Sequence, residues 1–116
     1  LDVIKEEKLQ ENASNIGDHL LDGLKDIQND FNIIGDVRGK GLFIGVELIK
    51  DMRNMIPAPN EAEFVVNAMK DKGILISSDG PDHNVLKIKP PLVFNKKNAD
   101  YFLESFEAVL SKSFKK

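Results

Sequence analysis

Residues 33–49 read IIGDVRGKGLFIGVELI, in which two apolar runs are separated by glycines on either side of a lysine. Short runs rich in Ile, Val, Leu and Phe are typical of strands, and closely spaced glycines suit a tight connection. The stretch therefore predicts a short antiparallel pair, with strands over 33–38 and 42–49. Because the second run is almost continuously apolar, we expect its strand to be covered on both faces.

A long helix is predicted before this pair. Apolar residues recur there at steps of three and four, which places them on one face of a helix. These residues are Leu9, Ala13, Ile16, Leu20, Leu24 and Ile27. The stripe continues through Gly17 and Gly23, although each glycine weakens a helix by up to about 1 kcal/mol.

A polar, proline-bearing loop is expected over 50–59, and a second helix follows it. Asn60 is predicted to cap this helix, and Glu63 to complete a capping box. Gly73 occupies the usual position of a helix end.

Two further strands are predicted over 74–77 and 85–89, with a polar loop between them. Pro90-Pro91 must end the second of these strands, because proline cannot continue a ladder of hydrogen bonds. A last helix, capped by Asn95, completes the order α-β-β-α-β-β-α. This order predicts a single α+β domain over residues 1–116, with helices packed on one small sheet.

Composition and charge exclude several classes of protein. The 116 residues are 41% hydrophobic and 30% charged, as in a globular domain. The net charge is −3 and the sequence has no basic block, so it shows no basic patch of the kind that binds nucleic acid. Cysteine is absent, so disulfides and thiolate metal sites are excluded, and no apolar run is long enough to cross a bilayer. The chain opens on Leu1 inside a helical pattern, which we interpret as a fragment of a longer protein.

Two motifs carry a family resemblance. Residues 36–48 (DVRGKGLFIGVEL) resemble the Val-Arg-Gly-x-Gly-Leu-x-x-Gly-x-Glu signature of class III aminotransferase small domains. Residues 86–92 (LKIKPPL) are similar to a strand ending in Pro-Pro-Leu that follows later in that family. The resemblance covers the whole chain. It implies the C-terminal small domain of a fold-type I enzyme that uses pyridoxal 5'-phosphate (PLP), with the large PLP-binding domain absent.

A narrower branch of the family matches residues 78–81 (SDGP) and 84–91 (NVLKIKPP). These segments resemble the alanine–glyoxylate aminotransferase 2-like phospho-lyases, which act on phosphoethanolamine or phosphohydroxylysine. The resemblance implies a PLP-dependent lyase that eliminates ammonia and phosphate from such a phosphorylated amine. The alternatives are an ω-amino-acid or alanine–glyoxylate aminotransferase and, from another class, a non-catalytic α+β interaction module.

Lys87 is the first candidate for a substrate-binding residue. In aminotransferase members of the family, an arginine in the strand before Pro-Pro clamps the substrate carboxylate through two parallel hydrogen bonds. Lys87 takes this position, and lysine is a point charge that makes a poorer bidentate clamp. This departure favours a substrate whose anion is a phosphate. Lys89, expected on the same face of the strand, is a weaker candidate. The alternative for both is a solvated strand lysine.

The remaining functional features are expected to lie elsewhere. A lysine of the large domain would hold PLP, so this fragment is predicted to contain no catalytic, cofactor-binding or metal-binding residue and to be inactive alone. The resemblance also implies a homodimer or dimer of dimers, and a mitochondrial location.

The other charged residues receive structural interpretations. Arg38 and Lys40 are expected to be solvated turn charges. Glu47 lies within an apolar run and needs a partner, for which Arg38 across the sheet is the candidate. His19 and His83 are interpreted as surface residues.

Overall fold

The predicted antiparallel pair forms the centre of the domain. The computed structural model describes residues 3–40, 43–51, 53, 56–89 and 95–114. Strands β1 (Ile34–Lys40) and β2 (Phe43–Asp51) pair in antiparallel register, with Val37 opposite Val46 and Gly39 opposite Ile44. The prediction of this pair is confirmed.

Two later strands extend the sheet. β5 (Val85–Ile88) pairs with β2, and β4 (Ser77–Asp79) pairs with β5 at the edge, both in antiparallel fashion. The resulting strand order is β1-β2-β5-β4. A short β3 (Ile56–Pro57) adds to the far end of β2, within the segment predicted to be a loop.

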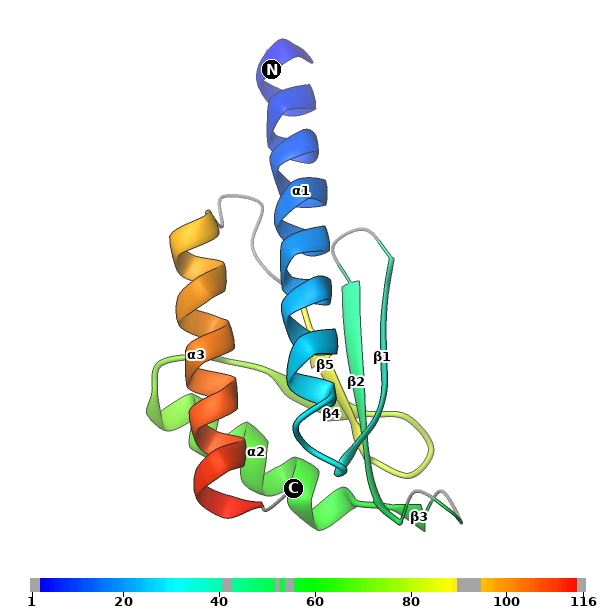
Figure 1. Cartoon of the computed structure of the whole chain (residues 1–116). Coiled ribbons are helices and arrows are strands. Elements are labelled where there is room, and N and C mark those ends of the chain that lie inside the picture. Colours follow the sequence, from blue (N-terminus) through cyan, green and yellow to red (C-terminus); the bar gives the residue numbers. More distant parts are fainter. Residues whose placement is uncertain (1–2, 41–42, 52, 54–55, 90–94, 115–116) are drawn as a thin grey trace.

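Three helices cover one face of this sheet (Figure 1). They are α1 (Val3–Gln28), α2 (Pro59–Asp71) and α3 (Lys96–Ser113). In Figure 1, α1 and α3 lie side by side, α2 crosses near their lower ends, and the N-terminal part of α1 extends past the sheet. The α+β layer prediction is therefore confirmed. No helix within the described ranges has the length and apolarity needed to cross a membrane.

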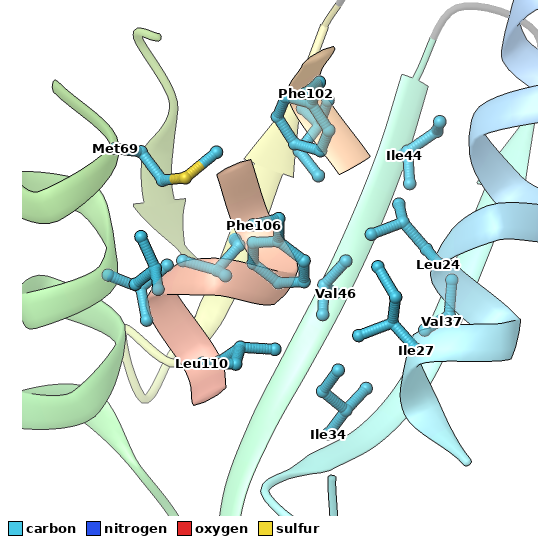
Figure 2. Close-up of a cluster of buried hydrophobic side chains, with 14 of the residues drawn as sticks. Leu24, Ile27, Ile34, Val37, Ile44, Val46, Met69, Phe102, Phe106 and Leu110 are labelled. Carbon is cyan, nitrogen blue, oxygen red and sulfur yellow. The ribbon is translucent and has the colours of Figure 1, made fainter. Parts of the chain in front are cut away.

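The core lies between the helices and the covered face of the sheet. Along α1, the predicted apolar stripe is buried from Ile16 through Ile27, while the side chains of Leu9 and Ala13 lie outside the described part of the chain. Figure 2 shows how side chains from every layer meet. Those labelled there are Leu24, Ile27, Ile34, Val37, Ile44, Val46, Met69, Phe102, Phe106 and Leu110.

The start of α2 differs from the prediction. The helix begins at Pro59, its N-cap is Ala58, and no side chain caps it, so the proposed Asn60 cap with Glu63 is wrong. Proline is favoured at the first helical position because its φ is preset and it has no N–H to satisfy there. The Ala58 N–H donates to the Leu48 carbonyl at 3.1 Å, which ties the helix start to the end of β2.

The end of α2 explains why β4 begins late. Gly73 has φ +81°, and the N–H of Ile74 donates back to the Met69 carbonyl at 2.9 Å. Gly73 thus ends the helix as predicted, because glycine tolerates this left-handed conformation. Since Ile74 still belongs to the helix-ending turn, the strand occupies 77–79 instead of the predicted 74–77.

Candidate functional site

The second face of the sheet is open and polar. Antiparallel neighbours project to the same side, so Arg38, Gly45, Lys87 and Ser77 form one row across four strands. The expectation that β2 is covered on both faces is wrong for this chain: Ile44, Val46 and Leu48 are buried, whereas Phe43 on the other side is 43% exposed. The strand reads as continuously apolar because phenylalanine and glycine line its open face.

A cavity of about 530 Å³ occupies this face. It is lined by side chains and backbone from β1, β2, β4, β5 and the turn between the last two strands. The lining residues are Arg38, Gly39, Phe43, Gly45, Glu47, Asp79, Gly80, Pro81, Asp82, Asn84, Val85 and Lys87. The cavity therefore brings Lys87 together with both members of the predicted Arg38–Glu47 pair.

Lys87 is held by two contacts within the cavity. Its Nζ lies 2.8 Å from Oδ2 of Asp79 and 5.1 Å from the centre of the Phe43 ring. The hydrogen bond from Lys87, aided by one from the Gly80 backbone, holds the pKa of the Asp79 carboxyl below its usual value of 3.8. Asp79 is thus an anion at neutral pH. Lys87 is half-buried and engaged, rather than an extended strand lysine with its ammonium only in water.

Arg38 is the second cation of the cavity. Its guanidinium donates to Oδ2 of Asp36 at 2.8 Å and lies 3.8 Å from Oε1 of Glu47. The predicted cross-strand pairing with Glu47 is confirmed, and Asp36 is a closer partner that the sequence analysis did not identify. Arg38 is exposed as expected, but it belongs to a strand rather than to a turn.

The turn over residues 80–84 forms one rim of the cavity. Gly80 has φ +90°, and its carbonyl accepts a hydrogen bond from the His83 N–H at 3.2 Å. Asn84 is buried and ties this turn to β2, because its side-chain amide donates to the Leu48 carbonyl at 2.9 Å. His83 is exposed, as predicted. The rim is therefore attached to the sheet by side-chain as well as backbone hydrogen bonds.

Gly45 leaves the floor of the cavity open. A Cβ atom there would lie 3.4 Å from Val85 and 3.8 Å from the Arg38 side chain. Gly45 stands between Arg38 and Lys87 in the row across the sheet. A larger side chain at this position would fill the space between the two cations.

Lys89 lies in a different place. It follows the last residue of β5 and lines a second cavity of about 410 Å³, on the side where Leu20 and Phe102 lie. The expectation that Lys87 and Lys89 share one face is therefore wrong, because the strand ends at Ile88 and its alternation ends with it. Pro90, Pro91 and Leu92 of the family motif lie outside the described residues.

Asp79 and Phe43 are the residues of this site that sequence reasoning missed. Asp79 belongs to a segment that was noted only for its family resemblance, and Phe43 was assigned to a fully covered strand. Asp79 could be identified only from the register of the strands. It pairs with Val85, which lies two residues from Lys87 and on the same face of β5. Register between β4 and β5 depends on the turn over 80–84 and is not readable from apolar patterning alone.

Comparisons with known proteins agree with the motifs. The chain is 49% identical over 110 residues to an alanine–glyoxylate aminotransferase 2-like protein of Drosophila melanogaster, covering 94% of this chain and 22% of that protein. It is 44% identical to the mitochondrial alanine–glyoxylate aminotransferase 2 homolog 2 of Arabidopsis thaliana, covering 97% of this chain and 24% of that protein. It is 41% identical to ethanolamine-phosphate phospho-lyase homolog 1 of Caenorhabditis elegans, over 94% of this chain and 24% of that protein.

Solved structures show the same similarity. A phospholyase from Arthrobacter in complex with phosphoethanolamine superposes with a TM-score of 0.86 and 36% identity, over 94% of this chain and 26% of that chain. A PLP-bound amine transaminase from an uncultivated Pseudomonas species has a TM-score of 0.80 and 28% identity, over 96% of this chain and 25% of that chain.

The matched relatives are longer proteins, and nearly the whole of this chain matches one part of each. This chain spans about a quarter of the length of these three relatives, which are named as aminotransferase 2-like or homologous proteins and as a phospho-lyase homolog. The profile of the family described as aminotransferase class-III matches residues 1–110. The chain therefore belongs to the class-III aminotransferase family.

Proposed function

We propose that this chain is the small domain of a PLP-dependent phospho-lyase that releases ammonia and phosphate from phosphoethanolamine or a similar phosphorylated amine. The observation that carries the proposal is Lys87, whose ammonium lies in an open cavity between Asp79 and the ring of Phe43. Two relatives also support the proposal. One is the phospholyase whose structure contains phosphoethanolamine, and the other is the ethanolamine-phosphate phospho-lyase homolog.

The net reaction consumes one water molecule. Phosphoethanolamine and water give acetaldehyde, ammonia and inorganic phosphate. PLP, when bound, supplies the electron sink that makes loss of a proton beside the amine possible. In this proposal, Lys87 binds and orients the phosphate of the substrate through a charge-assisted hydrogen bond.

In this proposal, the cavity does not hold PLP by itself. Such a site needs an amine for the aldehyde and several free donors for the phosphate of the cofactor. Lys87 is the one amine among the residues that line the cavity, and in this proposal it binds the phosphate of the substrate. We therefore propose that a large domain outside this chain holds the cofactor, and that this chain contributes substrate contacts only.

The test is Lys87→Ala in the full-length holoenzyme, assayed by release of acetaldehyde and phosphate. A charge-assisted hydrogen bond is worth about 1.5–3 kcal/mol, so kcat/KM for phosphoethanolamine should fall about ten- to a hundredfold. Lys87→Arg should lose less. Lys89→Ala is the matched comparison, because that lysine lines the other cavity and its loss is expected to change kcat/KM little. Wild-type kcat/KM in Lys87→Ala would refute the role of Lys87.

An aminotransferase is the second candidate, favoured by the names of the Drosophila and Arabidopsis relatives. The two activities differ in their need for a keto-acid acceptor. Elimination releases phosphate and acetaldehyde from phosphoethanolamine without an acceptor, whereas amino transfer proceeds only when one is added. Phosphate release without a keto acid supports the lyase. Conversion of an added keto acid to its amino acid, with the phosphate ester of the amine donor left intact, supports the aminotransferase.

Assembly and location complete the proposal. We propose a homodimer or dimer of dimers, which sedimentation of the full-length protein would test. A mitochondrial location is supported by the Arabidopsis relative, whose name places it there. Fractionation of cells that express the full-length protein would test this location.

A further inference from the structure

The ammonium of Lys87 has an anion of the chain itself as its partner. Nζ of Lys87 on β5 donates to Oδ2 of Asp79 on the edge strand β4 at 2.8 Å. The two residues are diagonal neighbours on the open face of the sheet, since Asp79 stands opposite Val85. Both side chains also face solvent, with 38% of Lys87 and 58% of Asp79 exposed. An anion from solution can therefore reach the ammonium, but it meets the carboxylate there.

Asp79 is held where it can compete with such an anion. The Gly80 backbone donates to its carboxylate, and the pKa of Asp79 lies below its usual value, so the group is charged at neutral pH. The turn that follows is fixed to the sheet, because the Asn84 amide donates to the Leu48 carbonyl at 2.9 Å. Since Asp79 is tethered beside Lys87, it can bind the ammonium without the entropy of association that a free ligand loses.

This ion pair imposes a cost on every anion that binds Lys87. The ligand must displace the Asp79 carboxylate or share the ammonium with it. Displacement breaks the same ion pair whichever anion enters. Sharing brings two anions close together, and their repulsion is larger for the more highly charged ligand. The pair therefore weakens the binding of phosphate at least as much as that of a carboxylate, and it gives no preference for phosphate.

Weaker binding has a use in a reaction that releases phosphate. In the proposed function, Lys87 binds the phosphate of the substrate, and elimination leaves inorganic phosphate beside its ammonium. This product is still an anion that accepts charge-assisted hydrogen bonds, and it must leave before the next substrate binds. Release of product limits the turnover of many enzymes. As phosphate leaves for solvent, the Asp79 carboxylate can take back the ammonium, and no covalent bond is made or broken.

We propose that Asp79 is an internal counter-ion that competes with inorganic phosphate for Lys87 and so limits the retention of this product. This inference rests on the proposed function, in which Lys87 binds the phosphate of the substrate. Asp79 acts only through Lys87 and is not a catalytic residue.

The experiment measures the binding of inorganic phosphate to the full-length holoenzyme by isothermal titration calorimetry, which requires no turnover. Asp79→Asn removes the competing charge and nearly keeps the size of the side chain. Its dissociation constant for phosphate should be about threefold smaller than that of the wild type, within the range for a partly exposed ion pair. The direction of the change separates this role from a structural one, because damage to the cavity, or loss of a residue that positions Lys87, would weaken binding.

Asp82→Asn is the matched control. Asp82 lines the same cavity, whereas the ion pair of Lys87 is with Asp79. The control removes an equal charge and should tighten phosphate binding less. An unchanged or larger dissociation constant in Asp79→Asn overturns the proposal, and so does equal tightening in Asp82→Asn.

Lys87→Ala distinguishes failure of this inference from failure of the proposed function. Weaker phosphate binding in this variant supports the anion-binding role of Lys87, and the result for Asp79→Asn then decides the inference alone. Phosphate binding equal to that of the wild type, or no phosphate binding by the wild type, refutes the role of Lys87 and the inference about Asp79 with it.

Discussion

His19 on α1 and Asp100 on α3 join the first and last helices of the domain. The Nε2 atom of His19 lies 2.7 Å from Oδ1 of Asp100, and both side chains are partly exposed, at 36% and 47%. His19 lies at the surface as predicted, but its side chain also contacts Asp100, a partner that the sequence analysis did not identify. The contact spans 81 positions of the sequence, so helical patterning within α1 gives no sign of it.

The His19–Asp100 contact is expected to contribute modestly to stability. Because both groups are partly solvated, Asp100→Asn should lower the free energy of unfolding by about 0.2–1 kcal/mol. Glu104→Gln on α3 is the matched control, since Glu104 is exposed, and its effect should be smaller. Urea denaturation measures both values. A loss well above this range would mean that the pair holds the helices together more than its exposure implies.

The capping box of α3 should matter more than the predicted cap of α2. The Asn95 side chain accepts from the Asn98 N–H at 2.8 Å, and the Asn98 side chain accepts from the Asn95 N–H at 3.1 Å. Asn95→Ala should therefore destabilise the domain by about 0.5–2 kcal/mol. Asn60→Ala should stay within about 0.5 kcal/mol, because Asn60 lies inside the first turn of α2 and does not cap it. Equal losses in thermal or urea unfolding would contradict this reading of the two helix starts.

Phe106 and Phe64 form a matched pair for testing the core. Phe106 is fully buried on α3, whereas Phe64 on α2 is 48% exposed and makes a T-shaped ring contact with Phe114. Phe106→Ala should cost about 3–5 kcal/mol, the range for a buried phenylalanine. Phe64→Ala should cost about 0.5–1.5 kcal/mol, the range for an aromatic pair. Chemical denaturation with unchanged m-values is the measurement.

The ion pair between Asp79 and Lys87 should make the stability of the domain depend on pH. Because the folded pKa of Asp79 is lowered, its contribution to stability is present above its ordinary value of 3.8 and is lost as the pH falls through the folded value. Lys87→Met removes the ammonium, so the pKa of Asp79 should rise toward its ordinary value. NMR titration of the Asp79 carboxyl in both proteins measures this. The same midpoint in both would show that Lys87 does not lower the pKa.

Local chemistry made much of the fold predictable. The stripe through Leu20 and Leu24, the antiparallel strand pair and the Asn95 cap each depend on residues close in sequence, and each is confirmed, although Gly39 belongs to β1 and not to the connection. The start of α2 and the place of β4 were wrong. Both depend on backbone hydrogen bonds, from Ala58 to Leu48 and from Ile74 to Met69, and periodicity does not report these bonds.

Only those residues of the site that stand out by their own type or by their position in a motif could be predicted from the sequence. Lys87 was identified by its position in a family motif, and Glu47 by its charge inside an apolar run. Asp79 and Phe43 complete the site through pairing between strands, so finding them required the register of the sheet. Lys89 was misplaced because the alternation of β5 was extended one residue past its end.

The alternation of β5 gives the domain a capacity for evolutionary change. Leu86 and Ile88 are buried under the helices, while Val85 and Lys87 line the open cavity. Substitutions at the second pair alter what the cavity attracts without removing any of the buried side chains that hold the layers together. Under the proposed role of Lys87, a lineage can therefore exchange one anion preference for another by single substitutions in this strand, while the buried side chains that support the cavity are kept.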